Sequence, residues 1–275
     1  MKKRFGLLGF PINHSLSSLI HQELFKIKNF DATYELFNIE EKNLNDFLKE
    51  INNLDGFNVT MPYKNTIYQI IKNKSKTAKK FQTTNTIVKY NNEFICYNTD
   101  NFGFLETLKH FEISLTNNTL LLGLGGAGKI VALNAIYSGS FLTVAIRPSS
   151  FLKTENTLKS LIPTKFHKNF EIVSINKIPN KIYKTIINAT PIGMANLKNY
   201  TPVSFNNLFG CKTAIDLIYS PKKTKFLLDA KKLKIKTING LYMLLMQAVK
   251  SNELFLNAKH KKDIVFKLYK TLKKL

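Results

Sequence analysis

Residues 119–136 have the sequence TLLLGLGGAGKIVALNAI. An apolar run typical of a buried strand passes into a glycine-rich turn and then into an apolar helical segment. Gly123, Gly125 and Gly128 fit the pattern G-x-G-x-x-G, which permits a tight turn and lets backbone N–H groups approach a pyrophosphate at the helix N-terminus. Glycines also serve in ordinary tight turns, but the position of this motif between strand and helix favours nucleotide binding.

Further strand-like runs follow the glycine-rich motif. They lie at 141–147, 171–175, 185–189, 214–218 and 235–238. Strands that alternate with helical segments are typical of βαβ units and of a largely parallel sheet. We therefore expect one α/β domain over residues 100–238.

The first part of the chain has an alternating series of its own. Strand-like runs lie at 5–10, 34–39 and 57–60, with helical runs at 16–28, 42–51 and 64–72. Two more strand-like runs flank Asn91-Asn92 and predict a β-hairpin. The fold class is therefore α/β with two domains, the first over residues 1–99. The helical tail, residues 239–275, fits either domain.

The chain of 275 residues is 44% hydrophobic, enough for a globular core, and carries a formal net charge of +23. This charge fits nucleic-acid binding, attraction of acidic small molecules, or the composition of an AT-rich genome, and the abundance of Lys, Asn, Ile and Phe without Trp favours the last explanation. A positive field also draws in anionic ligands. Because the sequence has no recognised nucleic-acid motif, we expect no specific nucleic-acid partner, only weak and salt-sensitive binding.

Cysteine content and hydropathy bear on the cellular location. Cys96 and Cys211 lie far apart in strand-like runs, which favours reduced thiols over a disulfide. The apolar run near the N-terminus is too short for a signal peptide, and no window has the apolar length that spans a membrane. We expect a cytoplasmic protein with no membrane partner and no metal site.

Arg147 follows the second strand of the domain that contains the glycine-rich motif, in the sequence AIRP. Chains that bind NAD usually place Asp or Glu here to hold the ribose hydroxyls. A guanidinium instead pairs with a ribose 2′-phosphate, which a carboxylate would repel. NADP is therefore the expected cofactor, with an ordinary exposed Arg at a strand end as the alternative.

Polar residues follow strands in both domains. Lys64 begins a predicted helix, where a cation opposes the helix dipole, and Asp100 precedes another helix as a natural N-cap. Gln247 lies within an apolar helix, where its amide either finds a partner or faces solvent. Each residue alone has an ordinary structural explanation. Ligands of open α/β sheets, however, bind beyond the carboxyl ends of the strands, so these positions also mark a candidate site.

An excess of polar groups follows the first strand, where residues 9–21 have the sequence GFPINHSLSSLIH. One capping side chain is enough to begin a helix. Here an Asn, a His and three serines occur within six residues. The surplus groups indicate a role other than capping.

In their order along the chain, these segments resemble the shikimate dehydrogenase family. The resemblance runs from Gly9 to Gln247 with similar spacing, and so many motifs in one order form a specific signal. It implies a split substrate-binding domain, residues 1–99 with the 239–275 helices returning to it. It also implies a Rossmann NADP-binding domain over residues 100–238.

The resemblance further implies roles for individual residues. Lys64 and Asp100 match the catalytic pair, while Ser15 and Ser17 match serines whose hydroxyls bind the substrate carboxylate. The positions that contact the substrate ring and its hydroxyls are matched by Thr60, Asn85, Asp100, Tyr219 and Gln247. The cofactor-binding positions are matched by Gly123, Gly125, Gly126, Ala127, Arg147, Leu217 and Gly240. The paired serines account for the surplus polar groups and favour shikimate over quinate as substrate.

The sequence departs from the family pattern at several positions. Ser18 replaces a Pro, Thr83-Thr84 replace Gly-Ala, and a Trp usual near the C-terminus is absent. The family triplet Asn-Arg-Thr is Ile-Arg-Pro at 146–148, so one polar contact to the adenosine ribose phosphate is lost. We therefore expect weaker discrimination between NADP and NAD. None of these changes touches the catalytic pair.

The reaction implied by the resemblance is the reversible, NADPH-dependent reduction of 3-dehydroshikimate to shikimate, a step in the biosynthesis of aromatic amino acids through chorismate. Reduction of a ketone builds negative charge on oxygen, which a cation stabilises and can protonate. Lys64 is expected to do both, with Asp100 orienting it. The alternatives are a quinate/shikimate dehydrogenase with relaxed use of NAD and NADP, and a non-catalytic NADP-binding sensor. Family members are commonly dimers or monomers, so a homodimer is one expected state.

Overall fold

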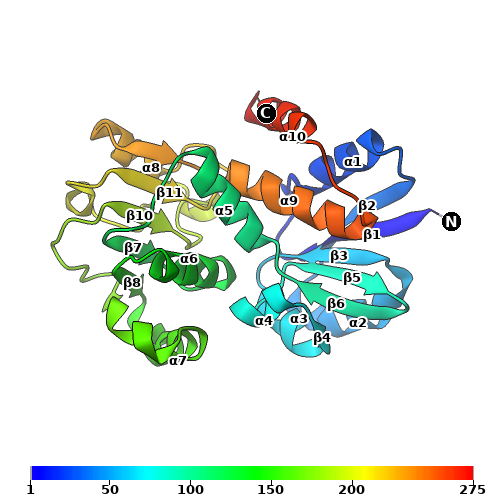
Figure 1. Cartoon of the computed structure of the whole chain (residues 1–275), viewed down its shortest axis with the longest axis horizontal. Helices are drawn as coiled ribbons and strands as arrows, with labels where there is room; N and C mark the ends of the chain where they lie inside the picture. The colour runs from blue at the N-terminus through cyan, green and yellow to red at the C-terminus, as the bar shows by residue number, and fades with distance from the viewer. Residues whose placement is uncertain (1, 275) are drawn as a thin grey trace. The chain divides into compact units, whose positions relative to one another are not determined.

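A computed structural model describes residues 2–274 of the chain, which divides into two compact units. Unit 1 comprises Met1–Gly103 and Leu245–Leu275, and unit 2 comprises Phe104–Leu244. The divisions fall within two helices, α5 (Asp100–His110) and α9 (Leu241–Leu256). Each unit contains one six-stranded sheet with helices packed against it (Figure 1). The expected fold class, α/β with two sheet-containing parts, is confirmed.

The sheet of unit 1 mixes parallel and antiparallel strands in the order β2-β1-β3-β5-β6-β4. The elements of this unit, besides parts of α5 and α9, are β1 (Lys3–Gly9), α1 (Ser17–Ile27), β2 (Ala32–Asn38), α2 (Leu44–Glu50), β3 (Gly56–Val59), α3 (Lys64–Ile70), β4 (Asn73–Lys74), α4 (Lys76–Phe81), β5 (Thr86–Tyr90), β6 (Glu93–Tyr97) and α10 (Lys262–Lys274). Strand β1 pairs in parallel with β2 and β3, whereas β5 runs antiparallel to β3 and β6. The predicted β5–β6 hairpin is confirmed, and both of its turn residues, Asn91 and Asn92, have the positive φ angles that a tight hairpin turn requires.

This strand arrangement gathers several chain segments at one edge of the sheet. The Thr60 N–H donates to the Leu8 carbonyl at 2.9 Å, which ties the end of β3 to the end of β1. The Asn85 N–H donates to the Tyr97 carbonyl at 3.2 Å, which brings the start of β5 beside the end of β6. The segments that follow β1, β3 and β6 and the one that precedes β5 therefore converge at this edge.

Unit 2 has an entirely parallel sheet in the order β12-β11-β10-β7-β8-β9. Its remaining elements are β7 (Thr119–Leu122), α6 (Gly126–Tyr137), β8 (Leu142–Ile146), α7 (Phe151–Leu161), β9 (Phe170–Ser174), β10 (Thr185–Asn188), β11 (Thr213–Asp216), α8 (Lys225–Lys232) and β12 (Lys236–Ile238). The chain winds outward from β7 to β9, returns to β10 beside β7, and winds outward again to β12. This is the doubly wound Rossmann order, whose ligand site lies at the switch point between the two central strands.

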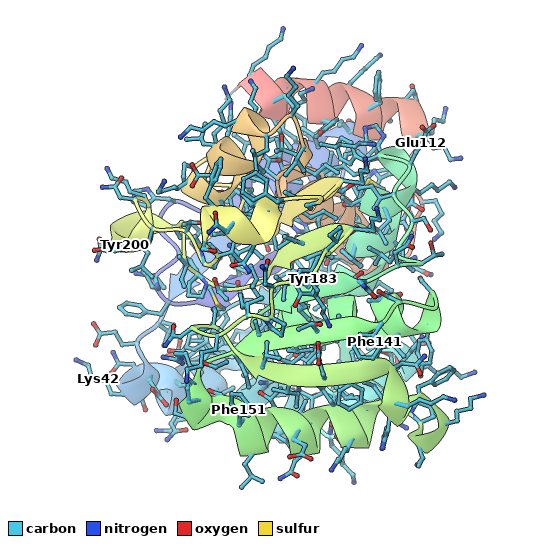
Figure 2. All side chains as sticks on the ribbon, turned by 90° about the vertical axis from the view of Figure 1, so that its left-hand side faces the viewer. Lys42, Glu112, Phe141, Phe151, Tyr183 and Tyr200 are labelled. Carbon is cyan, nitrogen blue, oxygen red and sulfur yellow. The ribbon has the colours of Figure 1, made fainter. Side chains whose placement is uncertain are left out.

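Burial explains why unit 2 forms this sheet. All residues of β7, β8, β10 and β11 are buried, as expected of parallel strands covered on both faces by helices. Figure 2 shows Tyr183, which lies just before β10 and is fully buried, and Phe151 at the start of α7.

Two features are absent from residues 2–274, the part of the chain that the structure describes. No helix in this range is both long and apolar enough to cross a membrane. Within the same range, no group of three or more His, Cys, Asp or Glu side chains could hold a metal ion.

Candidate active site

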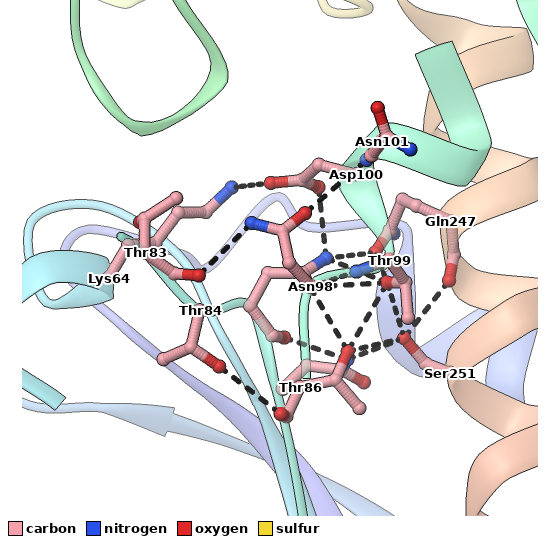
Figure 3. Close-up of polar contacts among 12 residues, drawn as sticks. Lys64, Thr83, Thr84, Thr86, Asn98, Thr99, Asp100, Asn101, Gln247 and Ser251 are labelled. Carbon is pink, nitrogen blue, oxygen red and sulfur yellow. Dashed lines mark hydrogen bonds and ion pairs between the residues drawn. The ribbon is translucent and has the colours of Figure 1, made fainter. Parts of the chain in front are cut away.

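An ion pair between Lys64 and Asp100 lies at the centre of the site in unit 1 (Figure 3). Lys64 is the first residue of α3 and Asp100 the first of α5, so two helix starts bring them together. The Lys64 Nζ atom is 2.6 Å from Asp100 Oδ2, and the two side chains are only 17% and 7% exposed. Asp100 Oδ1 accepts a second hydrogen bond, at 2.9 Å, from the amide of Asn85. The carboxylate is therefore held on both oxygens, beyond a simple helix-capping role.

Asn85 links this ion pair to helix α9. Its Oδ1 accepts from the Thr99 backbone N–H at 2.7 Å, which fixes the direction of the amide. Its Nδ2 lies 2.8 Å from Thr99 Oγ1, 2.9 Å from Asp100 Oδ1 and 3.0 Å from Gln247 Oε1. Gln247 therefore has a partner within unit 1 rather than facing solvent. Because an amide has two N–H hydrogens, these three oxygens compete for them.

A layer of hydroxyls lies behind Asn85, and sequence reasoning did not find it. The hydroxyls of Thr86, Thr99 and Ser251 lie 2.7 to 3.2 Å from one another. The Asn58 amide donates to Ser251 Oγ at 2.9 Å. All four side chains belong to buried residues, so the layer is shielded from bulk solvent. Ser251 stands among Lys250, Asn252 and Glu253 on α9, so no local pattern in the sequence sets it apart.

Ser15 and Ser17 present two hydroxyls at the segment that follows β1. Ser15 Oγ donates to Ser17 Oγ at 3.1 Å and accepts from the Ser17 N–H at 3.2 Å. The neighbouring Ser18 has a different task, since its hydroxyl donates to the Tyr34 carbonyl at 3.1 Å. The first two serines therefore form a pair of adjacent donors, while the third braces α1 against β2. Thr60, half-buried, lies at the end of the adjacent strand β3.

The glycine-rich loop of unit 2 lies between β7 and α6, at the switch point of the sheet. Gly123 has φ +87°, a conformation that L side chains rarely adopt, and a Cβ there would meet Thr190 Cγ2 at 2.8 Å. A Cβ on Gly128 would lie 2.5 Å from the Gly123 carbonyl oxygen. Gly125 differs, because its φ of −75° suits any residue and a Cβ there would have no protein atom within 4 Å. The fold does not require glycine at this position, which leaves open space at the N-terminus of α6, where a diphosphate fits.

Cationic side chains occur on chain segments next to this loop. Arg147 is exposed and directly follows β8, whose Ala145 carbonyl accepts from the Gly123 N–H at 2.9 Å. Lys129 lies on the first turn of α6, where burial and the nearby charge of Lys153 on α7 both lower its pKa. Sequence reasoning named Arg147 but missed Lys129 and Lys153. Mutual repulsion of this kind is relieved when a phosphate binds nearby.

A buried polar cluster closes the far side of the switch point. Asp216 Oδ2 accepts from the Thr224 hydroxyl at 2.6 Å, and Oδ1 accepts from the Asn188 amide at 3.1 Å. Burial raises the pKa of Asp216 to about 6, against the lowering effect of these hydrogen bonds. The cluster holds the segment that follows β11 and contains Leu217. Gly240, which follows β12, packs against this segment, since a Cβ on Gly240 would lie 2.0 Å from the Leu217 carbonyl oxygen. These last two residues, both named from the sequence, are thus in direct contact.

Comparison with known proteins identifies the family. A shikimate dehydrogenase (NADP(+)) of Clostridium botulinum is 35% identical over 250 residues, 88% of this chain and 92% of that protein. The chain belongs to the shikimate dehydrogenase family. The family model for the shikimate dehydrogenase substrate binding domain matches residues 7–87. The expected family resemblance is confirmed.

Solved structures of family members have the same fold. Shikimate dehydrogenase 1 of Peptoclostridium difficile has a TM-score of 0.89 and 32% identity, with 98% of each chain covered. A shikimate 5-dehydrogenase of Thermus thermophilus, in complex with NADP(H) and shikimate, has a TM-score of 0.84 and 26% identity, covering 98% of this chain and 99% of that one. The candidate site in each unit therefore lies in a fold shared along the whole chain.

The residues named from the sequence divide between the two units of this shikimate dehydrogenase family member. Unit 1 holds Ser15, Ser17, Thr60, Lys64, Asn85, Asp100 and Gln247. Unit 2 holds Gly123, Gly125, Gly126, Ala127, Arg147, Leu217, Tyr219 and Gly240. Within unit 1 the hydrogen bonds join Lys64, Asp100, Asn85 and Gln247 into one network.

Proposed function

We propose that the chain is an NADP-dependent shikimate dehydrogenase, which reversibly reduces 3-dehydroshikimate to shikimate. The observation that carries this proposal is the shielded Lys64–Asp100 ion pair, joined through Asn85 to Gln247. The curated relative carries the same name, and a similar structure contains NADP(H) and shikimate. The reaction would serve the biosynthesis of aromatic amino acids through chorismate.

The side chains of unit 1 suit a small polyhydroxylated acid. We assign the substrate carboxylate to the adjacent hydroxyls of Ser15 and Ser17, since paired neutral donors hold a carboxylate without a counter-charge. The ring and its hydroxyls are assigned to Thr60, Asn85, Asp100 and Gln247, and to Tyr219 in unit 2.

The loop and cations of unit 2 suit a dinucleotide with an extra phosphate. The open space beside Gly125 would take the diphosphate, with Gly123, Gly126 and Ala127 shaping the turn. Arg147 is assigned to the 2′-phosphate, since a guanidinium pairs with it and no acid occupies this position. Leu217 and Gly240, which touch each other, would line the nicotinamide side.

Lys64 and Asp100 divide the proton chemistry between them. NADPH, when bound, supplies the hydride. Lys64 stabilises the negative charge that develops on the carbonyl oxygen and gives that oxygen a proton, and in the reverse direction it takes the proton back. Asp100, 2.6 Å away, holds the ammonium group in place, and the Asn85 amide holds Asp100.

The proposal is tested by the absorbance of reduced nicotinamide, with purified protein, shikimate and either NADP or NAD. Rapid reduction of NADP with much slower reduction of NAD is the expected result. Quinate in place of shikimate should give little reduction, because Ser15 and Ser17 are both present. Comparable rates with both cofactors, or with quinate, would favour the quinate/shikimate alternative. NADP binding without any reduction would instead favour the sensor.

We also propose a cytoplasmic location and a homodimeric state. A cytoplasmic location is supported by Cys96 and Cys211, which are both unpaired thiols. Reaction of two thiols per chain after unfolding without reductant is the expected observation for protein isolated from cells. A homodimer is tested by light scattering of the purified protein at several concentrations.

A further inference from the structure

Ser251, on helix α9, is the centre of the hydroxyl layer behind Asn85. We infer that Ser251 is a positioning residue for substrate recognition, acting through Thr99 on the amide of Asn85. This inference rests on the proposed function, since it concerns how the same site recognises shikimate.

The contacts of Ser251 set the direction of hydrogen bonds in the layer. Its hydroxyl donates to the Gln247 carbonyl at 3.0 Å, one helical turn earlier, and accepts from the Asn58 amide at 2.9 Å. The hydroxyls of Thr86 and Thr99 lie 2.7 and 3.0 Å from it. When the one proton of Ser251 is directed to the carbonyl of Gln247, its oxygen has two acceptor positions for three neighbouring donors, and the Thr99 hydroxyl is one of these donors.

This direction reaches the ion pair through Thr99. When the Thr99 proton points to Ser251, the Thr99 oxygen is left as an acceptor for the Asn85 amide, 2.8 Å away. The other hydrogen of that amide is then directed to Asp100 Oδ1 at 2.9 Å. Asp100 is thereby aligned to hold Lys64, 2.6 Å away.

Loss of the Ser251 hydroxyl would change the direction of these hydrogen bonds. The Thr99 proton would turn to Asn85 Oδ1, 3.2 Å away, or to Gln247 Oε1, 3.5 Å away. Ser251 is fully buried and Thr99 is 2% exposed, so neither position is open to bulk solvent once the hydroxyl is lost. The expected result is a misdirected Asn85 amide and a less well aligned Asp100.

The experiment compares Ser251→Ala with the wild-type enzyme in shikimate oxidation and in calorimetric titration with shikimate. We expect KM and Kd for shikimate to rise about tenfold, with KM for NADP unchanged. Ser251→Thr, which keeps the hydroxyl, should restore most of the affinity. Thr99→Val breaks the link while leaving Ser251 in place, and should show the same rise even if Ser251→Ala does not fold.

Ser140→Ala is the matched control, because Ser140 is also a fully buried hydroxyl, bonded to Thr119 at 2.8 Å, but belongs to unit 2. It should lower the thermal midpoint about as much as Ser251→Ala while leaving KM for shikimate unchanged. Wild-type affinity in both Ser251→Ala and Thr99→Val would overturn the inference. A wild-type chain that neither binds nor oxidises shikimate would refute the proposed function, and the inference with it.

Discussion

The two units of the molecule build their candidate sites from different materials. In unit 1 the site consists of side chains that meet from distant parts of the chain, as when Asn58 bonds Ser251 across 193 positions. In unit 2 the glycine-rich loop is formed by a few consecutive residues. The absence of a side chain at Gly125 leaves the open space in which a diphosphate fits. Substitutions in the site of unit 1 should therefore change catalysis and substrate recognition, whereas those in the glycine-rich loop of unit 2 should change cofactor binding alone.

The largest effect is expected from Lys64→Ala in unit 1. Removal of the group that stabilises and protonates the oxygen should lower kcat by about a thousandfold, with Kd for NADP unchanged. Steady-state kinetics and fluorescence titration with NADPH measure the two quantities. Lys49→Ala is the control, because Lys49 pairs with Asp46 at 2.8 Å but both side chains are largely exposed. Near-normal kcat in Lys64→Ala, with only KM raised, would show that Lys64 binds rather than catalyses.

Gly125→Val tests the corresponding statement for unit 2. The new side chain would fill the open space at the N-terminus of α6, so Kd for NADP should rise about a hundredfold while the thermal midpoint stays within a degree or two of wild type. Gly128→Ala is the contrasting variant, because its Cβ would lie 2.5 Å from the Gly123 carbonyl oxygen and must disturb the fold. Unchanged cofactor binding in Gly125→Val would show that the diphosphate does not bind at this position.

The same difference, between contacts of distant residues and patterns of neighbouring ones, explains which features could be predicted from the sequence. A glycine motif, a strand entering a helix and an Asn91-Asn92 turn each depend on neighbouring residues, so the fold of unit 2 and the hairpin of unit 1 follow from local patterns. The short β4 strand and helix α4 were missed, because a two-residue strand has no periodicity to detect.

The site of unit 1 could not be assembled from local patterns. Lys64 and Asp100 are 36 positions apart, and considered separately they are a surface lysine and a helix cap. Only the order of motifs along the chain, matched to a family, paired them. Ser251 had no motif at all, and its role depends on the hydroxyls of Thr86 and Thr99 that tertiary packing places beside it.

The two units should also respond oppositely to acid between pH 6.5 and pH 4.5. In unit 1, burial and the charge of His260 lower the pKa of His21 to about 3, so the unfolded chain binds a proton that the folded chain refuses. Stability therefore falls on acidification, by about 2 kcal/mol. In unit 2, burial raises the pKa of Asp216 to about 6, so the folded chain binds the proton first. Stability then rises on acidification, also by about 2 kcal/mol.

These two contributions nearly cancel in the wild-type chain, and single variants separate them. Relative to wild type, His21→Gln should become more stable on acidification and Asp216→Asn less stable, each by about 2 kcal/mol. Urea unfolding at pH 6.5, 5.5 and 4.5 gives the three curves. Parallel curves for all three proteins would show that neither buried group changes its protonation on unfolding.

The smallest effect is expected from Arg147→Ala in unit 2. Arg147 is exposed, and the residues around it are Ile-Arg-Pro rather than the polar triplet of the family, so its pairing with a 2′-phosphate is partly screened by water. The ratio of kcat/KM for NADP over NAD should fall about tenfold, with KM for shikimate unchanged. Lys153→Ala is the informative companion, because the charge of Lys153 acts on Lys129 at the first turn of α6. A further fall in the double variant would show that lysines supply the contacts missing from the triplet. If Arg147→Ala left this ratio unchanged, discrimination between NADP and NAD would rest entirely on the lysines.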